Sequence, residues 1–388
     1  MKVCMVGYTF YENDGRVLRY AETLANRGDY VDVVALRRKG QSKVGRLNGV
    51  NVYRIQEREI NEKNKFSYFW RISKFLINSG IFLTRKSIRN KYDLIHIHSV
   101  PDFEVFAAII AKFVGSKIIL DIHDIVPEFY ASKFNTNHNS FLYKALIYLE
   151  KLSIAFSHHV IISNHIWEKT LLSRSVKPSK CTTIMNYPDA SIFSKRRKNR
   201  SNDKFIIIYP GTLNLHQGVD IAIKAFAIIS DEVPEAEFHI YGEGPTKNEL
   251  TGMIEAYELS AKVLLKEPVS ITQIAEVMAD ADLGIIPKRN DSFGGEAFST
   301  KTLEFMSLGV PIIVSKTTID QYYFDESIVK FFEPENEKDL AEAILLLIRD
   351  PELRENLAKN SLRYVKKNNW DVKKHIYLEI IDSLTNKI

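Results

Sequence analysis

The chain has 388 residues, of which 45 % are hydrophobic and 26 % charged, an ordinary globular composition. Lys and Arg exceed Asp and Glu by 53 − 48 = 5, an excess too small to indicate a nucleic-acid-binding protein. The length exceeds one ordinary core and suffices for two. The two cysteines are expected to be reduced thiols, and neither a signal peptide nor a membrane-spanning run is visible. The sequence therefore predicts a cytoplasmic protein, with peripheral contact to the inner membrane face left open.

The first half of the chain alternates strand patterns with helix patterns. Helical spacing follows the first strand at Val17, Ala21 and Leu24, and Gly28 is typical of a helix end. Compact apolar runs predict strands at 2–6, 30–36, 94–98, 117–122 and 159–162. Strands that alternate with helices indicate a parallel sheet covered on both faces, with the carboxyl ends of the strands along one edge.

A polar, strongly basic stretch interrupts this alternation at 195–204, where the sequence reads KRRKNRSNDK. Because it contains no apolar residue, we interpret 196–204 as a linker between a first domain at 1–195 and a second domain at 205–370.

The second half repeats the pattern of the first. Strands are expected at 205–209, 237–241, 263–265, 283–286 and 311–315, and helices at 219–229, 247–259, 300–307, 337–348 and 351–366. The simplest architecture is α/β, with two doubly wound, Rossmann-like domains. Ligands of such sheets bind outside the carboxyl ends of the strands, and two facing domains form a cleft between them.

The segment around the predicted helix at 300–307 carries the most chemistry. Glycines ahead of a helix leave backbone N–H groups and a positive dipole end available for phosphate. Glu304, two turns after Glu296, could then accept hydrogen bonds from ribose hydroxyls. Two glutamates on a helix are commonly solvated, but Phe305 and Met306 indicate that this helix docks on an apolar strand. The candidate binding residues of the segment are Gly294, Gly295, Phe298, Ser299, Thr300 and Glu304.

The spacing of Glu296 and Glu304, followed by Gly309-Val310-Pro311 and a strand, resembles the C-terminal domain of glycosyltransferase family 4, which has the GT-B fold. Further segments resemble the family at 209–213, 217–218, 241–245 and 281–287 in the second half, and at 13–17, 185–189 and 370–371 elsewhere. The resemblance implies an acceptor domain at 1–195, a nucleotide-sugar donor domain at 205–370 and a last helix at 371–388 that packs back on the first domain.

The resemblance also implies an activity. Family members are retaining glycosyltransferases, here of the hexosyltransferase type, that move a sugar from a nucleotide-diphosphate sugar to an acceptor hydroxyl. A sugar or lipid-linked acceptor, in surface polysaccharide or lipid-linked glycan synthesis, is expected. In the family's front-face mechanism the leaving phosphate takes the acceptor proton, and the protein supplies position and charge stabilisation. No cofactor and no metal are expected, since Asp280-Ala281-Asp282 has the letters of a metal motif but precedes a strand.

Residue roles follow from the same resemblance. Glu304 would bind the ribose, and Glu296 would hold hydroxyls of the transferred sugar. His123, which follows the strand at 117–122, would contact the donor sugar from the first domain, and His98 is a further candidate for this contact. Gly211 and Gly242 lie in the glycine turns that resemble the family's donor-binding loops.

The chain departs from the family in the first loop of its second domain. An Arg and a Lys that normally neutralise the donor diphosphate are replaced by Thr212 and Gln217. Either the chain is inactive or other cations serve, because charge develops on the leaving diphosphate. The candidates are Lys288, Arg289, Lys301 and Arg16, with Arg289 and Lys301 preferred. Two alternatives stay open: a nucleotide-sugar 2-epimerase on the same fold, and a non-catalytic GT-B partner subunit.

A basic and aromatic stretch occupies 63–91. Its cations include Lys65, Arg71, Lys74, Arg85 and Arg89, and they alternate with Phe66, Tyr68, Phe69, Trp70 and Phe82. Such a helix can lie on an anionic membrane surface, with its aromatic residues at the interface. It can equally pack its aromatic side chains into the domain and expose its charges to water, and both interpretations stay open.

Overall fold

The computed structural model describes residues 1–58, 65–99, 101–134, 139–200 and 203–385. The chain forms two compact units. Unit 1 comprises Met1–Asn186 and Lys373–Ile388, and unit 2 comprises Tyr187–Val372. Unit 2 is thus one continuous segment inserted between the two parts of unit 1.

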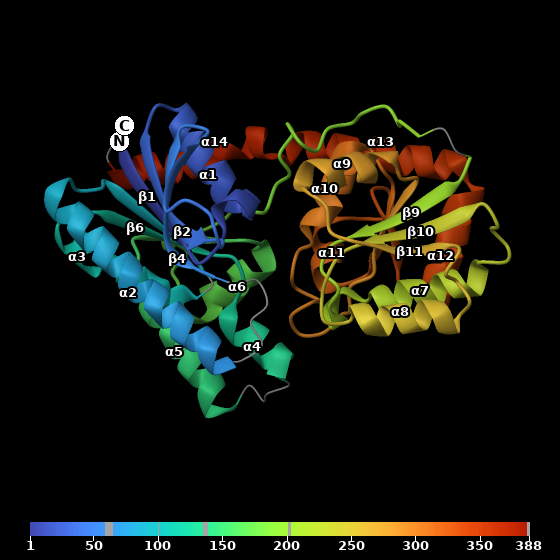
Figure 1. Ribbon diagram of the computed structural model, residues 1–388, viewed down its shortest axis with the longest axis horizontal. Coiled ribbons are helices and arrows are strands. Elements are labelled where there is room, and N and C mark those ends of the chain that lie inside the picture. Colours follow the sequence, from blue (N-terminus) through green and yellow to red (C-terminus); the bar gives the residue numbers. More distant parts are fainter. Residues whose placement is uncertain (59–64, 100, 135–138, 201–202, 386–388) are drawn as a thin grey trace. The chain divides into compact units, whose positions relative to one another are not determined.

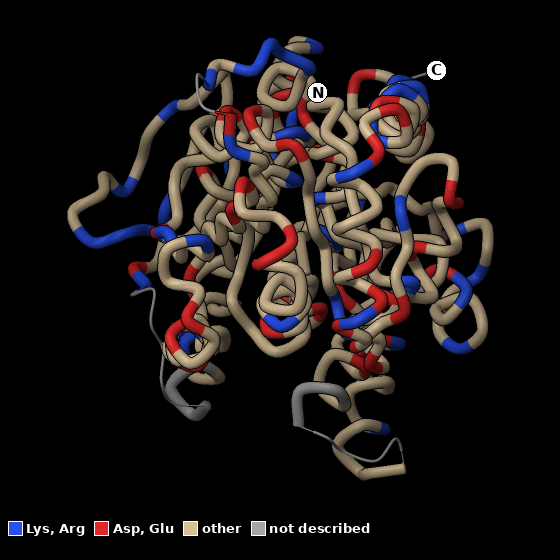
Figure 2. The backbone as a smooth tube through the Cα atoms, turned by 90° about the vertical axis from the view of Figure 1, so that its right-hand side faces the viewer, with Lys and Arg blue, Asp and Glu red and all other residues tan. Residues whose placement is uncertain are grey.

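The division differs from the predicted boundaries because the segment before residue 201 packs on unit 2. Lys198 and Arg200 both form ion pairs with Asp282, and the N–H of Asn199 donates to the carboxylate of Asp280 at 2.7 Å. The stretch read as a linker is therefore held to unit 2 by the two aspartates of the D-x-D letters. Positions of Lys and Arg are interspersed with positions of Asp and Glu along much of the backbone (Figure 2).

Unit 1 is built on a sheet of eight strands in the order β3-β4-β2-β1-β5-β6-β7-β8, parallel except for the β3–β4 pair. The strands are β1 (Lys2–Gly7), β2 (Tyr30–Arg37), β3 (Val44–Leu47), β4 (Val50–Glu57), β5 (Leu94–His98), β6 (Lys117–Ile122), β7 (His159–Ile162) and β8 (Cys181–Thr183). Five of these were predicted, and the antiparallel edge hairpin β3–β4 and the short β8 are additional.

Helices cover both faces of this sheet (Figure 1). One face carries α1 (Gly15–Asn26) and α14 (Trp370–Thr385), where the rings of Tyr20 and Tyr377 lie 4.2 Å apart. The other face carries α2 (Lys65–Arg89), the 3-10 helix η2 (Asp102–Ala108) and α5 (Phe141–Phe156). The remaining helices of the unit are η1 (Tyr11–Asn13), α3 (Ile109–Phe113), α4 (Val126–Phe134), α6 (His165–Arg174) and η3 (Pro178–Lys180).

Unit 2 is built on a parallel sheet of six strands in the order β11-β10-β9-β12-β13-β14. The strands are β9 (Phe205–Pro210), β10 (Ala236–Tyr241), β11 (Val263–Lys266), β12 (Leu283–Ile286), β13 (Ile312–Ser315) and β14 (Lys330–Phe332). The helices are η4 (Leu215–Gln217), α7 (Val219–Ile229), α8 (Lys247–Ala256), α9 (Ile271–Asp280), α10 (Thr300–Leu308), α11 (Thr318–Tyr323), α12 (Glu337–Arg349) and α13 (Pro351–Lys367). Both units are thus doubly wound α/β folds, as predicted.

Each sheet has a point at which the strand order reverses. In unit 1 it lies between β1 and β5, and in unit 2 between β9 and β12. Loops that leave neighbouring strands in opposite directions open a crevice at such a point, and ligands of doubly wound sheets bind there. Ligand contacts are therefore expected from the loops after β1 and β5 in unit 1 and after β9 and β12 in unit 2. No helix of the described residues is both long enough and apolar enough to cross a bilayer.

Candidate functional site

Glycines let the loops at the unit 2 crevice approach one another closely. Gly218 has a φ of 64°, and a Cβ at this position would lie 1.9 Å from the carbonyl oxygen of Pro287. A Cβ on Gly242 would lie 1.9 Å from the carbonyl oxygen of Gly211. Only glycine fits at these contacts, because no real Cβ comes so near a backbone atom. The loop after β9 is therefore packed between the loops after β10 and β12.

The N–H groups of two glycines that we predicted to bind the donor are engaged within the protein. The N–H of Gly211 donates to the carbonyl of Tyr241 at 2.8 Å, and that of Gly242 donates to the carbonyl of Lys266 at 3.1 Å. These glycines consequently shape the floor of the crevice through close backbone packing.

The turn ahead of α10 differs from the expected phosphate cradle. The N–H of Gly294 donates to Asp291 Oδ1 at 2.7 Å, and the N–H of Gly295 donates to the Asp291 carbonyl at 2.9 Å. Burial alone would raise the pKa of Asp291, but the hydrogen bonds from Gly294 and from His216 outweigh it and lower the pKa. Both glycine N–H groups are therefore occupied by Asp291, that of Gly294 by its carboxylate and that of Gly295 by its main-chain carbonyl. The nearby ring of Phe298, another predicted contact, packs against Tyr323 at 5.2 Å.

The first turn of α10 itself is better placed for an anion. Ser299 is the N-cap of the helix, and its hydroxyl makes no capping hydrogen bond. This hydroxyl is buried, and neither it nor that of Thr302 has a hydrogen-bond partner among the described residues. Buried hydroxyls normally have partners, and a helix N-terminus attracts phosphate through its N–H groups and dipole. Ser299 and Thr300, both predicted contacts, lie at this turn.

Lys301 is the cation of this turn. Its Nζ lies 3.2 Å from Gln217 Oε1 and 5.4 Å from the ring centre of Tyr209. It is also close to Gly211, since a Cβ there would lie 3.0 Å from Nζ. Burial lowers the pKa of Lys301 to about 8, although Glu304 acts in the opposite direction. No ion pair among the described residues includes Lys301, so its charge faces the Gly211 loop without a carboxylate in contact.

The two glutamates of the motif lie on either side of this lysine in sequence. Glu304 follows Lys301 by three residues on the same side of α10, and both are half-buried. Glu296 is also half-buried, and its N–H donates to the carbonyl of Phe293 at 3.1 Å. Lys301 therefore places a cation beside the end of β9, and Glu304 lies one turn further along the same helix.

The cations that follow β12 are neutralised by neighbouring helices, contrary to the preference for Arg289. Its guanidinium forms two hydrogen bonds to Asp220 at 2.9 and 2.7 Å and an ion pair with Glu335 at 3.0 Å. Lys288 pairs with the buried Asp320 at 2.9 Å. Because their charges are already compensated, these two residues hold the β12 loop to α7 and α11.

Arg16 is likewise engaged within its own unit. Its Nε and Nη2 donate to the two carboxylate oxygens of Asp121 at 2.8 and 2.6 Å. Its Nη1 donates to the carbonyl of Ile184 at 2.7 Å and to Asn186 Oδ1 at 2.9 Å. The arginine is buried. This arrangement differs from the expected diphosphate contact, since all three guanidinium nitrogens have protein acceptors.

Asp121 is also the acceptor for two histidines. His98 Nδ1 lies 3.1 Å and His123 Nε2 3.0 Å from Asp121 Oδ2. His96, beside them, contacts the hydroxyl of Tyr377 through Nδ1 at 3.0 Å. Burial lowers the pKa of His96 and His98. Burial would raise the pKa of Asp121, but the charge of Arg16 holds it well below its usual range.

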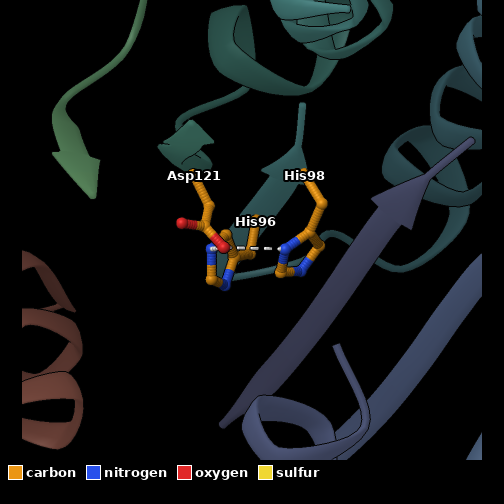
Figure 3. Close-up of side chains that lie close together, drawn as sticks. All are labelled: His96, His98 and Asp121. Carbon is orange, nitrogen blue, oxygen red and sulfur yellow. Dashed lines mark hydrogen bonds and ion pairs between the residues drawn. The ribbon is translucent and has the colours of Figure 1, made fainter. Parts of the chain in front are cut away.

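Figure 3 shows that His96, His98 and Asp121 converge, and their donor atoms lie within 4.8 Å of one another. The spacing alone would allow a metal ion. However, Arg16 already matches the charge of the carboxylate, and a second cation in this dry setting would be repelled. The cluster therefore fits an orienting network better than a metal centre.

The network presents His123 to a cavity of about 260 Å³ at the unit 1 crevice. The side chain of His123 is 22 % exposed. The cavity is also lined by Gly7, Tyr8, Thr9, Asp14, Arg58, His98, Ser99 and Asp124. Sequence reasoning assigned no role to Asp121, although a lone carboxylate inside the apolar run KIILDI was a usable signal.

Comparison with known proteins identifies the family. The model of glycosyl transferases group 1 matches residues 191–363, and that of Glycosyltransferase Family 4 matches residues 16–191. The phosphatidylinositol N-acetylglucosaminyltransferase gpi3 subunit of Schizosaccharomyces pombe is 26 % identical over 353 residues, which cover 89 % of this chain and 72 % of the relative.

Solved structures show the same fold at low sequence identity. Sucrose-phosphate synthase from Thermosynechococcus elongatus superposes with a TM-score of 0.80 at 16 % identity, over 100 % of both chains. Anabaena HepE in complex with UDP-glucose superposes with a TM-score of 0.71 at 15 % identity, over 100 % of this chain and 99 % of HepE. Since the two family models together run from residue 16 to residue 363, the chain belongs to the group 1, family 4 glycosyltransferases and has the GT-B fold.

Proposed function

We propose that this glycosyltransferase binds the diphosphate of a nucleotide sugar between the first turn of α10 and the Gly211 loop, with Lys301 as its neutralising cation. The position of the Lys301 ammonium is the observation that carries the proposal. It is half-buried, it has no carboxylate of the described residues in contact, and it lies next to Gly211. HepE, a structural neighbour, was solved with UDP-glucose, which supports a nucleotide-sugar donor.

Lys301 supplies a positive charge to the loop after β9, which has no cation of its own at positions 212 and 217. Thr212 and Gln217 lack the charges that the family resemblance leads one to expect at these positions. Lys301 reaches the same loop from α10 and contacts Gln217 directly. A partly desolvated ammonium stabilises charge that develops on the leaving diphosphate more strongly than a solvated one, because less screening intervenes. The presence of the Lys301 ammonium at this loop therefore supports an active transferase over a non-catalytic partner subunit.

The remaining roles belong to the same proposal. Glu304 binds the ribose, Glu296 holds hydroxyls of the transferred sugar, and His123, which is oriented by Asp121, is a further contact to the donor sugar. The leaving phosphate accepts the proton of the acceptor hydroxyl on the face from which it departs, so that configuration is retained. The chemistry requires neither a metal nor a cofactor.

The acceptor that we propose is lipid-linked and presented at the cytoplasmic face of a membrane. The gpi3 relative is named for transfer to phosphatidylinositol. In addition, α2 exposes Trp70 and Ile88 among basic residues. Lys63, the first residue of the stretch read as membrane-binding, lies outside the described residues, as do the side chains of 65–68. An amphipathic basic helix of this kind binds anionic bilayers.

Donor binding is tested by thermal unfolding in the presence of UDP-, GDP- and dTDP-sugars. A ligand at 100 times its Kd stabilises the folded state by about 2.7 kcal/mol. The matching donor, carrying a labelled sugar, is then incubated with lipid extract. Label in a lipid product supports transfer, isomerised donor alone indicates the 2-epimerase, and binding without turnover indicates the non-catalytic partner. No stabilisation by any of these donors would contradict the proposed site.

A further inference from the structure

The outer side of α2 carries an apolar ridge made of Trp70, Ile77, Ile81 and Ile88 (α2 in Figure 1). These residues are 71, 60, 46 and 73 % exposed. They recur at i, i+7, i+11 and i+18, which places them on one stripe of a helix. The opposite side of α2 is fully buried at Phe75 and Leu83. The ridge is thus a second apolar face that the core of unit 1 does not cover.

A basic groove runs beside this ridge, between α2 and the edge hairpin β3–β4. It has a volume of about 530 Å³, and its apolar lining includes Val44, Ile55, Ile81 and Phe82. Among the described residues, no acidic side chain lines it. Its cations are Arg37, Lys43, Arg54, Arg85, Lys86 and Arg89. Since Ile81 belongs to both features, the groove opens directly onto the apolar ridge.

Half of the cations in the basic groove are already neutralised. Arg37 pairs with Glu57 at 2.8 Å, Arg54 pairs with Glu12, and Lys86 lies 3.6 Å from the buried carboxylate of Asp32.

Lys43, Arg85 and Arg89 take part in no ion pair among the described residues, and all three are exposed. The basic groove therefore holds about three uncompensated positive charges above an apolar lining. A ligand that satisfies both must be anionic at one end and apolar at the other.

We propose that the basic groove binds one anionic phospholipid drawn from the bilayer on which the ridge rests. Its phosphate lies among Lys43, Arg85 and Arg89, and the first carbons of its chains lie along Ile81 and Phe82. The proposal deepens the membrane contact put forward above and rests on it. A soluble polyanion would leave the apolar lining unused, whereas a lipid uses both parts of the groove.

The direct test uses dihexanoylphosphatidylglycerol below its micelle concentration, titrated calorimetrically. The groove variant is Arg85→Gln with Arg89→Gln. The control variant is Lys74→Gln with Lys91→Gln, which removes the same charge from exposed positions outside the groove. At about 1 kcal/mol, or roughly fivefold, per cation, the groove variant is expected to bind about 25-fold more weakly, and the control within about twofold of the parent.

Three results would overturn the proposal. Equal weakening in the control would reduce the groove to general surface charge. Equally tight binding of glycerol 3-phosphate would make it a site for free anions, and equally tight binding of dihexanoylphosphatidylcholine would remove the role of net charge.

A bilayer test accompanies the titration. Trp167 and Trp370 are buried, so a blue shift of tryptophan fluorescence on vesicles reports Trp70. The parent is expected to shift on phosphatidylglycerol vesicles and not on phosphatidylcholine vesicles, and the absence of any shift would contradict contact of the ridge with a bilayer.

Nucleotide-sugar turnover is measured on the same samples. Absence of lipid binding with intact turnover refutes the basic groove alone. Absence of turnover in the parent refutes the proposed transfer and leaves the lipid result standing.

Discussion

Replacement of Lys301 by methionine is expected to weaken donor binding and at the same time to stabilise the free protein. A charge-assisted hydrogen bond contributes about 1.5–3 kcal/mol, which corresponds to a loss of about 10- to 150-fold in donor affinity. The stability gain has the opposite origin. Burial lowers the pKa of Lys301 from 10.5 to about 8. At about 1.4 kcal/mol per pH unit, this sets an upper limit of about 3 kcal/mol for the penalty that the ammonium imposes on the folded state.

The pH dependence of this penalty follows from the sign of the shift. Below about pH 8 the side chain is charged in both folded and unfolded protein, so the folded state bears the full penalty. As the pH rises from 8 towards 10.5, folded Lys301 loses its proton and the penalty fades. Donor affinity follows the ammonium, so the Kd is expected to rise about tenfold per pH unit above 8 until it reaches the Kd of the Lys301→Met variant.

The assay pairs thermal unfolding without ligand with calorimetric donor titration at pH 7 and pH 9. Lys301→Arg should retain most of the affinity and lose its dependence on pH in this range. Lys359→Met, at an exposed position of α13, controls for the loss of a lysine elsewhere on unit 2. Should Lys301→Met lower both the melting temperature and the affinity, or leave the affinity unchanged, the lysine would be a structural residue and the reasoning would be refuted.

Three further outcomes test the surrounding structure. Arg289→Ala should lower the melting temperature while donor affinity changes less than about threefold, since its charge is already paired; a tenfold loss in titration would restore it as a diphosphate contact. Asp121→Asn should destabilise unit 1 by about 3–5 kcal/mol in urea unfolding because Arg16 is left buried without its partner, and a change below 1 kcal/mol would contradict the network. Gly218→Ala should lower the free energy of unfolding by more than about 2 kcal/mol or prevent folding. Gly252→Ala, with open space around its Cβ on α8, should be neutral or stabilising by up to about 1 kcal/mol. Equal thermal stability of the two variants would be inconsistent with the close approach of Gly218 to Pro287.

Sequence patterns located the central strands well because buried parallel strands are continuous apolar runs. The run at 283–286 and the strand β12 coincide. The edge hairpin escaped notice because the buried positions of β4 include Arg54 and Gln56, so its alternating burial does not appear in the sequence as an alternation of apolar and polar residues. The three residues of β8 are too few to carry any periodicity.

The site was predictable where its chemistry is local in sequence and not where it depends on distant partners. Lys301 and Glu304 share one helix turn, so their proximity follows from spacing. Arg16 finds its acceptor 105 residues away, at Asp121, and Arg289 finds Asp220 69 residues away. Spacing along the chain carries no information about such pairs, so the sequence could not show that the charges of both candidate arginines are compensated within the protein.

The insertion of unit 2 within unit 1 sets the order in which a ribosome can complete the two. Tyr377 is fully buried in unit 1, against Tyr20 and within hydrogen-bonding distance of His96. This tyrosine emerges after all of Tyr187–Val372 has been made. The unit whose synthesis begins first is consequently the one whose interior is closed last, and a nascent chain stalled after Val372 would contain all of unit 2 while unit 1 still lacked most of its last helix.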